Sequence, residues 1–154
     1  MPRVAILGAG PIGASIAQRL AERSRVADVL LIDDNGSLAQ GKALDLMQTG
    51  PIDGSDTRLA GGADSLSAAG ADVIVFADDT ATGPWDGDRG LQLVGRLVRA
   101  GATAPFVFAA PSQFSHMETA AGELPLSRDR MIGTAASALE PMVASLVNIE
   151  LGRT

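Results

Sequence analysis

Three glycines near the N-terminus have the spacing of a turn that binds phosphate. Gly8, Gly10 and Gly13 form the pattern Gly-x-Gly-x-x-Gly directly after the apolar run 4–7. In such a turn the first glycine permits a tight bend, the second lets a diphosphate approach the backbone, and the third lets a helix pack close to the strand. The free N–H groups and positive dipole end of that helix then face the phosphates. We therefore expect a dinucleotide diphosphate to contact Gly8, Gly10, Pro11, Ile12 and Gly13.

A carboxylate follows the second apolar run at the distance that dinucleotide binding requires. The run 29–32 ends at Asp33, twenty residues after Gly13, where the fold places the acid that accepts hydrogen bonds from the adenosine ribose. Its charge would repel a 2′-phosphate and Asp34 adds to that charge, so we expect NAD in preference to NADP. In a chain with 18 glycines the bare pattern is weak evidence. The alternative is an ordinary strand–helix turn with a loop aspartate.

Apolar runs alternate with helical patterns along the chain, which predicts an α/β fold. Strands are expected at 4–7, 26–32, 57–60, 71–77, 105–110 and 130–132. Helices are expected at 11–24, 37–48, 64–69, 91–98, 112–121 and 134–151, the last kinked at Pro141, and turn-rich loops at 49–56 and 78–88. This alternation implies a parallel sheet covered on both faces. We expect one domain over 1–154, a doubly wound Rossmann sheet with strand order 3-2-1-4-5-6.

The ligand crevice of such a sheet lies at the carboxyl ends of its first and fourth strands. This places Ala77 and Asp78 opposite the glycine turn, so both are candidate cofactor contacts. Asp79 is adjacent, and two carboxylates near a diphosphate disfavour an anionic cofactor by an energy on the order of a few kcal/mol for each close pair. We expect weakened rather than abolished binding.

Composition excludes several other classes of function. The net charge of −6 argues against binding to nucleic acid or to an anionic membrane. No apolar run is long enough to span a bilayer, and the N-terminus enters a strand by Val4 without a signal peptide, so we expect a cytoplasmic protein. There is no cysteine, and one histidine leaves few soft metal ligands.

A few further residues could do chemistry, and each has a plainer interpretation. His116 could act as a general acid or base, but no partner carboxylate is indicated. Lys42 is expected to be a solvated surface lysine. Trp85 is either a cap over the crevice or an interface contact. Four aspartates could hold a divalent cation, although an acidic surface loop is the commoner explanation: Asp78, Asp79, Asp86 and Asp88. We expect no metal.

Longer strings resemble the N-terminal half of the malate/lactate dehydrogenase family. The stretch 4–13 is followed by Leu31-Ile32-Asp33 and then by the string QGKALDLMQ at 40–48, and the segments 71–76 and 130–134 extend the match. Nothing in generic dinucleotide binding requires the QGKALDLMQ string, so it discriminates more than the glycine turn. The resemblance implies an NAD-binding domain that forms a homodimer through the helix 37–48.

The same resemblance implies chemistry that this sequence lacks. In the family, a second domain supplies a histidine–aspartate pair, and we expect no substrate or catalytic domain within 1–154. Two loop arginines of the family correspond to Thr82 and Asp88, with Arg89 one residue further on. The asparagine before the proline after the fifth strand corresponds to Ala110, and an aspartate and an arginine of the last helix correspond to Leu139 and Met142. We therefore assign no catalytic residue.

Three hypotheses follow for the function. The first is an NAD(H)-binding domain of malate/lactate dehydrogenase type that is not active as an isolated chain. The second is one half of a split NAD-dependent 2-hydroxy-acid dehydrogenase, which needs a partner chain that carries the catalytic domain. The third is an interaction module that has kept the fold and lost the cofactor.

Overall fold

The computed structural model describes residues 2–23, 26–85, 87–109 and 113–134. Its six-stranded sheet is parallel, with the order β3-β2-β1-β4-β7-β8. The strands are β1 (Arg3–Leu7), β2 (Asp28–Ile32), β3 (Arg58–Gly62), β4 (Val73–Phe76), β7 (Phe106–Phe108) and β8 (Met131–Gly133). The helices are α1 (Pro11–Glu22), α2 (Gly36–Asp53), α3 (Gly87–Arg99) and α4 (Gln113–Glu123), with short 3-10 turns η1 (Ser65–Gly70) and η2 (Arg128–Arg130). The predicted α/β parallel sheet is confirmed.

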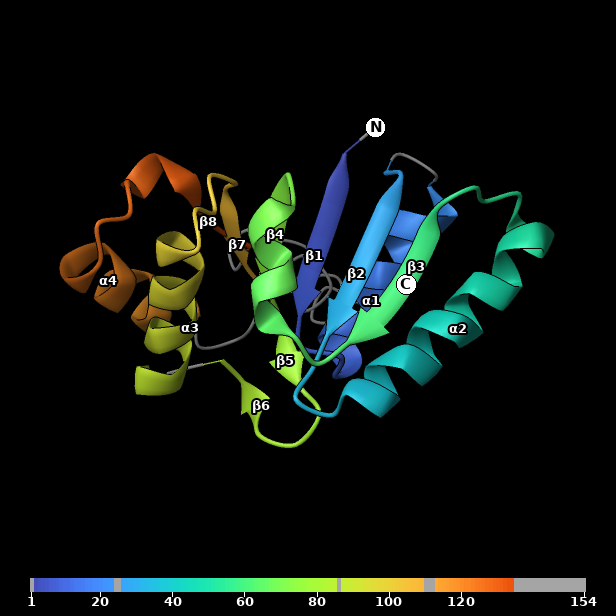
Figure 1. The fold of residues 1–154 in the computed structure, drawn as a ribbon, viewed down its shortest axis with the longest axis horizontal. Helices are drawn as coiled ribbons and strands as arrows, with labels where there is room; N and C mark the ends of the chain where they lie inside the picture. The colour runs from blue at the N-terminus through green and yellow to red at the C-terminus, as the bar shows by residue number, and fades with distance from the viewer. Residues whose placement is uncertain (1, 24–25, 86, 110–112, 135–154) are drawn as a thin grey trace, which may run out of the picture.

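Two further strands lie outside this sheet and were not predicted. The strands β5 (Asp78–Asp79) and β6 (Gly83–Pro84) pair antiparallel with each other. The order of the main sheet is therefore 3-2-1-4-7-8 rather than 3-2-1-4-5-6, because the fifth and sixth strands of the chain lie outside this sheet. Figure 1 shows the pair β5–β6 beyond the carboxyl end of β1. The predicted loop 78–88 therefore contains a small hairpin at the edge where the crevice was expected.

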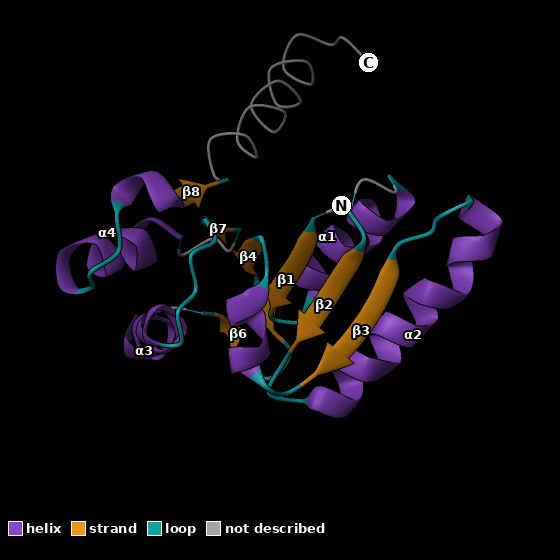
Figure 2. Ribbon diagram, turned by 45° about the horizontal axis from the view of Figure 1, so that its top comes forward, coloured by secondary structure: helices purple, strands orange, loops and turns teal. Residues whose placement is uncertain are grey.

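Alternating side chains of β1 pack on opposite faces of the sheet. Val4 and Ile6 join the apolar cluster formed with α1 and α2, whereas Ala5 and Leu7 join the cluster formed with η1 and α3. Figures 1 and 2 show these helices on the two sides of the sheet. All four side chains are buried, as a strand covered on both faces requires. Packing on both faces therefore holds β1 in place, and with it the start of the turn that follows at Gly8.

The second helix extends further than its sequence suggests. We expected a loop over 49–56 because of its glycines and proline, but α2 continues to Asp53. It ends where Gly54 adopts the left-handed conformation, with φ 68°, and its N–H bonds to the carbonyl of Gly50. The prediction was wrong because the turn residues form the last helical turn and its cap rather than a separate loop.

Other boundaries shift by a few residues. The predicted strand 57–60 continues to Gly62, and the predicted helical turn at 64–69 is η1, whose first turn is capped by the carboxylate of Asp64. Residues 135–151 of the predicted helix 134–151, with its kink at Pro141, lie outside the described residues, as do the replacements at Ala110, Leu139 and Met142. Within the described part of the chain, no helix is long and apolar enough to cross a membrane.

Candidate functional site

The glycine turn joins β1 to α1 and admits no side chain at its three glycines. Gly8 has φ 107°, a conformation that side chains rarely adopt, and a Cβ there would lie 2.3 Å from the carbonyl oxygen of Asp78. A Cβ on Gly13 would lie 1.9 Å from the carbonyl oxygen of Gly8. The turn therefore has the backbone geometry expected of a phosphate-binding turn. In this structure, the atoms nearest to a Cβ at Gly8 or Gly10 belong to another residue of the chain.

That residue is Asp78, which lies two positions after the end of β4. Its carboxylate Oδ1 accepts a hydrogen bond from the N–H of Gly13 at 2.9 Å, and its backbone carbonyl accepts one from the N–H of Gly10 at 2.8 Å. A Cβ on Gly10 would lie 2.4 Å from the other carboxylate oxygen. The N-cap residue of α1 is Gly10, which has no side chain to form a cap. The Asp78 carboxylate supplies that cap and places its negative charge at the positive end of the helix dipole.

Asp33 lies at the expected position at the end of β2, and only 1% of it is exposed. Its Oδ2 accepts hydrogen bonds from the N–H groups of Ala9 at 2.8 Å and Thr80 at 3.0 Å. Its Oδ1 accepts from the N–H of Asn35 at 2.9 Å and from the hydroxyl of Thr80 at 2.6 Å. The carboxylate is therefore in contact with the glycine turn, and both of its oxygens already have donors.

The segment 78–85, which we call the strap, covers this edge of the sheet. Within it, Asp79 is 3% exposed and accepts hydrogen bonds from the N–H groups of Ala81 at 2.9 Å and Thr82 at 3.0 Å. Burial raises the pKa of Asp79, but these two N–H donors and the positive charge of Arg89 outweigh burial and hold the pKa below its ordinary value. Asp79 is therefore a charged residue that organises the strap from within.

Arg89 fastens the strap to the rest of the site. From α3, its guanidinium forms ion pairs with the carboxylates of Asp34 at 2.6 Å and Asp79 at 3.3 Å, and it also donates to the hydroxyl of Thr82. The guanidinium carbon lies 3.8 Å from the ring centre of Trp85, a cation–π geometry. The guanidinium of Arg89 therefore links Asp34, after β2, to Asp79 in β5 and to Trp85, after β6.

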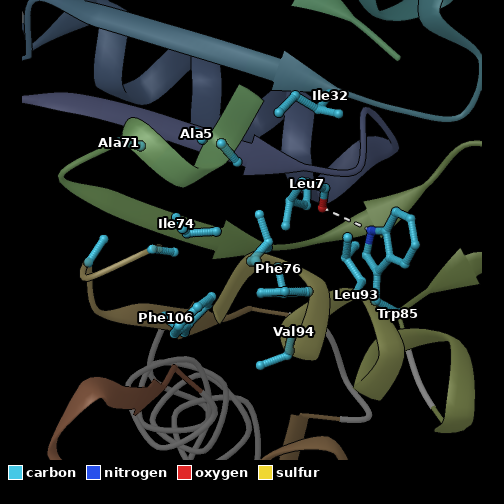
Figure 3. Close-up of a cluster of buried hydrophobic side chains, with 14 of the residues drawn as sticks. Ala5, Leu7, Ile32, Ala71, Ile74, Phe76, Trp85, Leu93, Val94 and Phe106 are labelled. Atoms are coloured by element: carbon cyan, nitrogen blue, oxygen red, sulfur yellow. Dashed lines mark hydrogen bonds between the residues drawn. The ribbon is translucent and has the colours of Figure 1, made fainter. Parts of the chain in front are cut away.

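Trp85 ends the strap inside the core. The indole N–H donates to the carbonyl of Leu7 at 3.1 Å, as Figure 3 shows with a dashed line, and the ring packs beside Leu93 in the cluster below α3. Only 6% of the residue is exposed, so neither of the two expected roles describes its position in this structure. Trp85 anchors the strap to β1.

The structure brings together the residues that the sequence singled out. The glycine turn, Asp33, Asp34, Ala77 and Asp78 all lie at the carboxyl edge of the sheet, and the N–H of the buried Ala77 bonds to the carbonyl of Leu7 at 2.9 Å. Their roles as cofactor contacts stay predictions. The sequence analysis did not foresee the part of Thr80, which no motif marks, and it noted Arg89 only as a shifted loop arginine. These residues share the site because β4 returns to the sheet beside β1.

Two other candidates lie differently from expectation. The ammonium of Lys42, expected in solvent, donates to the carbonyl of Ala9 at 2.5 Å and so supports the glycine turn from α2. His116 is buried, with its ring edge-on to Phe76 and Phe108 at 5.3 and 4.9 Å between ring centres. Among the side chains that the structure describes, no group of three or more acids or histidines is arranged to hold a metal, and Asp86 falls outside that set.

The groups expected to contact a dinucleotide form hydrogen bonds within the chain in this structure. The N–H groups of Gly10 and Gly13, which would face a diphosphate, both donate to Asp78. The two oxygens of Asp33, which would accept from a ribose, are taken partly by Thr80. These donors and acceptors therefore bond to the strap in this structure.

Comparisons with known proteins agree with this architecture. The family model described as "lactate/malate dehydrogenase, NAD binding domain" matches residues 2–94. Over 82 residues the chain is 44% identical to the malate dehydrogenase of Thermomicrobium roseum, which is 53% of this chain and 26% of that protein. Over 76 residues it is 43% identical to the malate dehydrogenase of Thioalkalivibrio sulfidiphilus, which is 49% of this chain and 25% of that protein.

Solved structures show the same fold. The malate dehydrogenase of Plasmodium falciparum in complex with NADH superposes with a TM-score of 0.81 at 22% identity, covering 100% of this chain and 50% of that one. The lactate dehydrogenase of Cryptosporidium parvum, complexed with lactic acid and nicotinamide adenine dinucleotide, gives a TM-score of 0.69 at 26% identity, with 87% and 45% covered. The chain thus spans half or less of these relatives. It belongs to the lactate/malate dehydrogenase family, as the NAD-binding domain of that family.

Proposed function

We propose that this chain binds NAD(H) through the glycine turn and Asp33 and does not catalyse hydride transfer by itself. The observation that carries the proposal is the 2.8 Å hydrogen bond from the N–H of Ala9 to Asp33. It holds the carboxylate that we assign to the ribose beside the turn that we assign to the diphosphate, and a dinucleotide has these two groups next to each other. Family membership supports the same assignment.

The adenosine side of the site supports NAD over NADP. Asp33 is buried at the end of β2, and Asp34 follows it with a side chain that is 65% exposed. An arginine near this position would favour a 2′-phosphate, but Arg89 is already paired with Asp34 and Asp79. The net charge around the ribose position is therefore negative, which disfavours the additional phosphate of NADP.

Catalysis needs groups that the described site does not bring together. Reduction of a 2-keto acid requires a proton donor at the carbonyl and a cation for the carboxylate. Among the described residues the one histidine, His116, packs between phenylalanine rings, and Arg89 is held by two carboxylates. A partner chain with the catalytic residues, as in a split dehydrogenase, is the second candidate. It is favoured by the position of Asp33 beside the glycine turn, in a site whose described residues bring no such donor or cation together.

A homodimer through α2 belongs to the same proposal. Three large apolar side chains of this helix are exposed, at fractions of 39 to 50%: Leu38, Leu44 and Met47. A groove of about 330 Å³ lies between α1 and α2, lined in part by Ala14, Lys42 and Leu46. Exposed apolar side chains on a surface helix are typical of a protein interface. The cytoplasmic location expected from the sequence also stays a prediction, which fractionation of the native cells would test.

Calorimetric titration with NADH and NADPH tests the proposed function. We expect binding of NADH, much weaker binding of NADPH, and loss of NADH binding in Asp33→Ala. The matched control is Asp56→Ala, which removes an exposed carboxylate between α2 and β3, away from the carboxyl edge, and should bind as the wild type does. Equal binding of NADH by wild type and Asp33→Ala would refute the assigned ribose acceptor.

A further inference from the structure

The Asp78 carboxylate lies against the glycine turn, on donors of the kind that bind a diphosphate. It has the same sign of charge as a phosphate, and its Oδ1 accepts the N–H of Gly13 at 2.9 Å. Its Oδ2 fills the space that the missing Cβ of Gly10 leaves open. The side chain is nine-tenths buried, so it is inserted into the turn rather than lying on the surface. A chemical match of this kind lets one residue compete with a ligand for the same donors.

The same strap closes the neighbouring ribose position two residues later. Thr80 donates twice to Asp33, at 3.0 and 2.6 Å. Since Asp78 and Thr80 are separated by one residue, a backbone displacement of this segment withdraws both residues from their partners. The diphosphate and ribose positions are thus blocked by one short segment, and one displacement opens both.

We propose that Asp78 is an internal occupant of the diphosphate position, so that the strap holds the nucleotide site closed and NADH binds only when Asp78 is displaced. This inference rests on the proposed function, because it names what regulates that same site. The apparent affinity for a ligand falls by the fraction of molecules in which the site is open. A hydrogen bond to a charged group is strong enough to make that factor about ten- to a hundred-fold.

The test is to remove the carboxylate and measure binding of NADH by calorimetry. We expect Asp78→Ala to bind NADH at least about ten-fold more tightly than the wild type, because the N–H of Gly13 loses its acceptor and the carboxylate no longer holds the strap on the turn. Asp88→Ala is the matched control: it removes one negative charge at the start of α3, where the side chain is exposed and makes no contact with the turn in the described structure. Asp88→Ala should bind as the wild type does.

A second variant and a second readout separate closure from simple loss of charge or loss of fold. Asp78→Asn keeps an oxygen that can accept from Gly13, so its gain in affinity should be smaller than that of Asp78→Ala. The amide resonance of Gly13 reports the contact without any ligand, and it should move in Asp78→Ala and not in Asp88→Ala. Thermal unfolding shows which variants are folded. If Asp78→Ala is not folded, Asp78→Asn and its Gly13 amide resonance test the proposal instead.

The outcomes distinguish the two proposals. If wild type and Asp78→Ala bind NADH equally well, closure by Asp78 is refuted while the proposed function stands. If neither binds at millimolar NADH although both are folded, the proposed function is refuted. In that case, a Gly13 amide resonance that does not move in Asp78→Ala also refutes the proposed contact between Asp78 and the turn. A resonance that does move supports this contact, although the turn then binds no NADH.

Discussion

Thr80 bonds to Asp33 through both its backbone N–H and its hydroxyl, at 3.0 and 2.6 Å, and this pair joins the strap to the end of β2. The two residues are 47 positions apart in the chain. Asp33 is almost fully buried beneath the contact. A residue expected to accept hydrogen bonds from a ribose thus accepts them from the chain's own threonine.

Replacing the hydroxyl of Thr80 should weaken the strap. Thr80→Val keeps the shape and the backbone N–H but removes the 2.6 Å donor to Asp33. We expect the free energy of unfolding to fall by about 1–3 kcal/mol, the range for a lost hydrogen bond to a charged group. Urea denaturation measures it, with Thr103→Val in the exposed α3–β7 connection as control. Equal unfolding midpoints for the two variants would show that the hydroxyl contributes nothing.

Two helical glycines should respond oppositely to alanine. A Cβ on Gly13 would meet the carbonyl oxygen of Gly8 at 1.9 Å, so Gly13→Ala must separate α1 from β1 and destabilise the protein. Gly41 lies in α2 with nothing within 4 Å of an added Cβ, and Gly41→Ala should stabilise by about 0.5–1 kcal/mol. Thermal unfolding of both variants checks the contrast. A neutral Gly13→Ala would mean that the turn is looser than the structure shows.

Acid should destabilise the protein partly through Asp79. Its pKa in the folded state lies below the ordinary value of 3.8, so the unfolded chain binds the proton more tightly. The stabilisation is therefore present above about pH 4 and is lost as the pH falls through the lowered folded-state pKa. We expect Asp79→Asn to flatten the pH dependence of the free energy of unfolding below pH 4, because the variant no longer has this carboxylate to protonate. An unchanged slope from pH 5 to pH 2 in the variant would contradict this.

Arg89 should control the environment of the single tryptophan. Arg89→Met removes the ion pairs to Asp34 and Asp79 and the contact with the Trp85 ring. We expect the strap to loosen and the emission of Trp85, now largely buried, to shift to longer wavelength. Arg96→Met, on the same helix and exposed, is the control. If the emission of the two variants coincides, Arg89 does not fasten the strap.

The exposed face of α2 should carry the dimer. Leu44→Glu places a charge where a side chain is half exposed, and we expect it to convert a dimer into a monomer in sedimentation equilibrium. Leu66→Glu on η1 introduces the same charge at a similarly exposed leucine and should leave the dimer intact. A wild-type monomer would remove the proposed interface altogether.

The sheet could be predicted because its determinants are local. The run 4–7 is apolar at every position, and the glycines follow it directly. A helical pattern separates each later strand from the one before it. The position of Asp33 also followed, since it depends only on where β2 ends. The extent of α2 did not, because Gly50 and Pro51 usually mark loops, and the helix instead ends at Gly54.

The closed state of the site could not be predicted from spacing. The sequence placed Asp78 opposite the glycine turn and indicated electrostatic repulsion of a cofactor. It did not indicate a hydrogen bond to Gly13, because that contact depends on the direction of a side chain 65 residues away. Thr80 and Arg89 carry no motif, and their roles arise from the hairpin β5–β6, whose strands have two residues each and leave no periodic pattern.

The most direct test of the account is to map NAD onto the backbone by amide resonances of the labelled chain. We expect saturating NAD to shift the resonances of Ala9, Gly10, Gly13 and Thr80, because these N–H groups lie at the proposed diphosphate and ribose positions. Resonances of α4 should stay in place. Shifts confined to another surface, or none at saturating NAD, would contradict the claim that the glycine turn and Asp33 form a cofactor site.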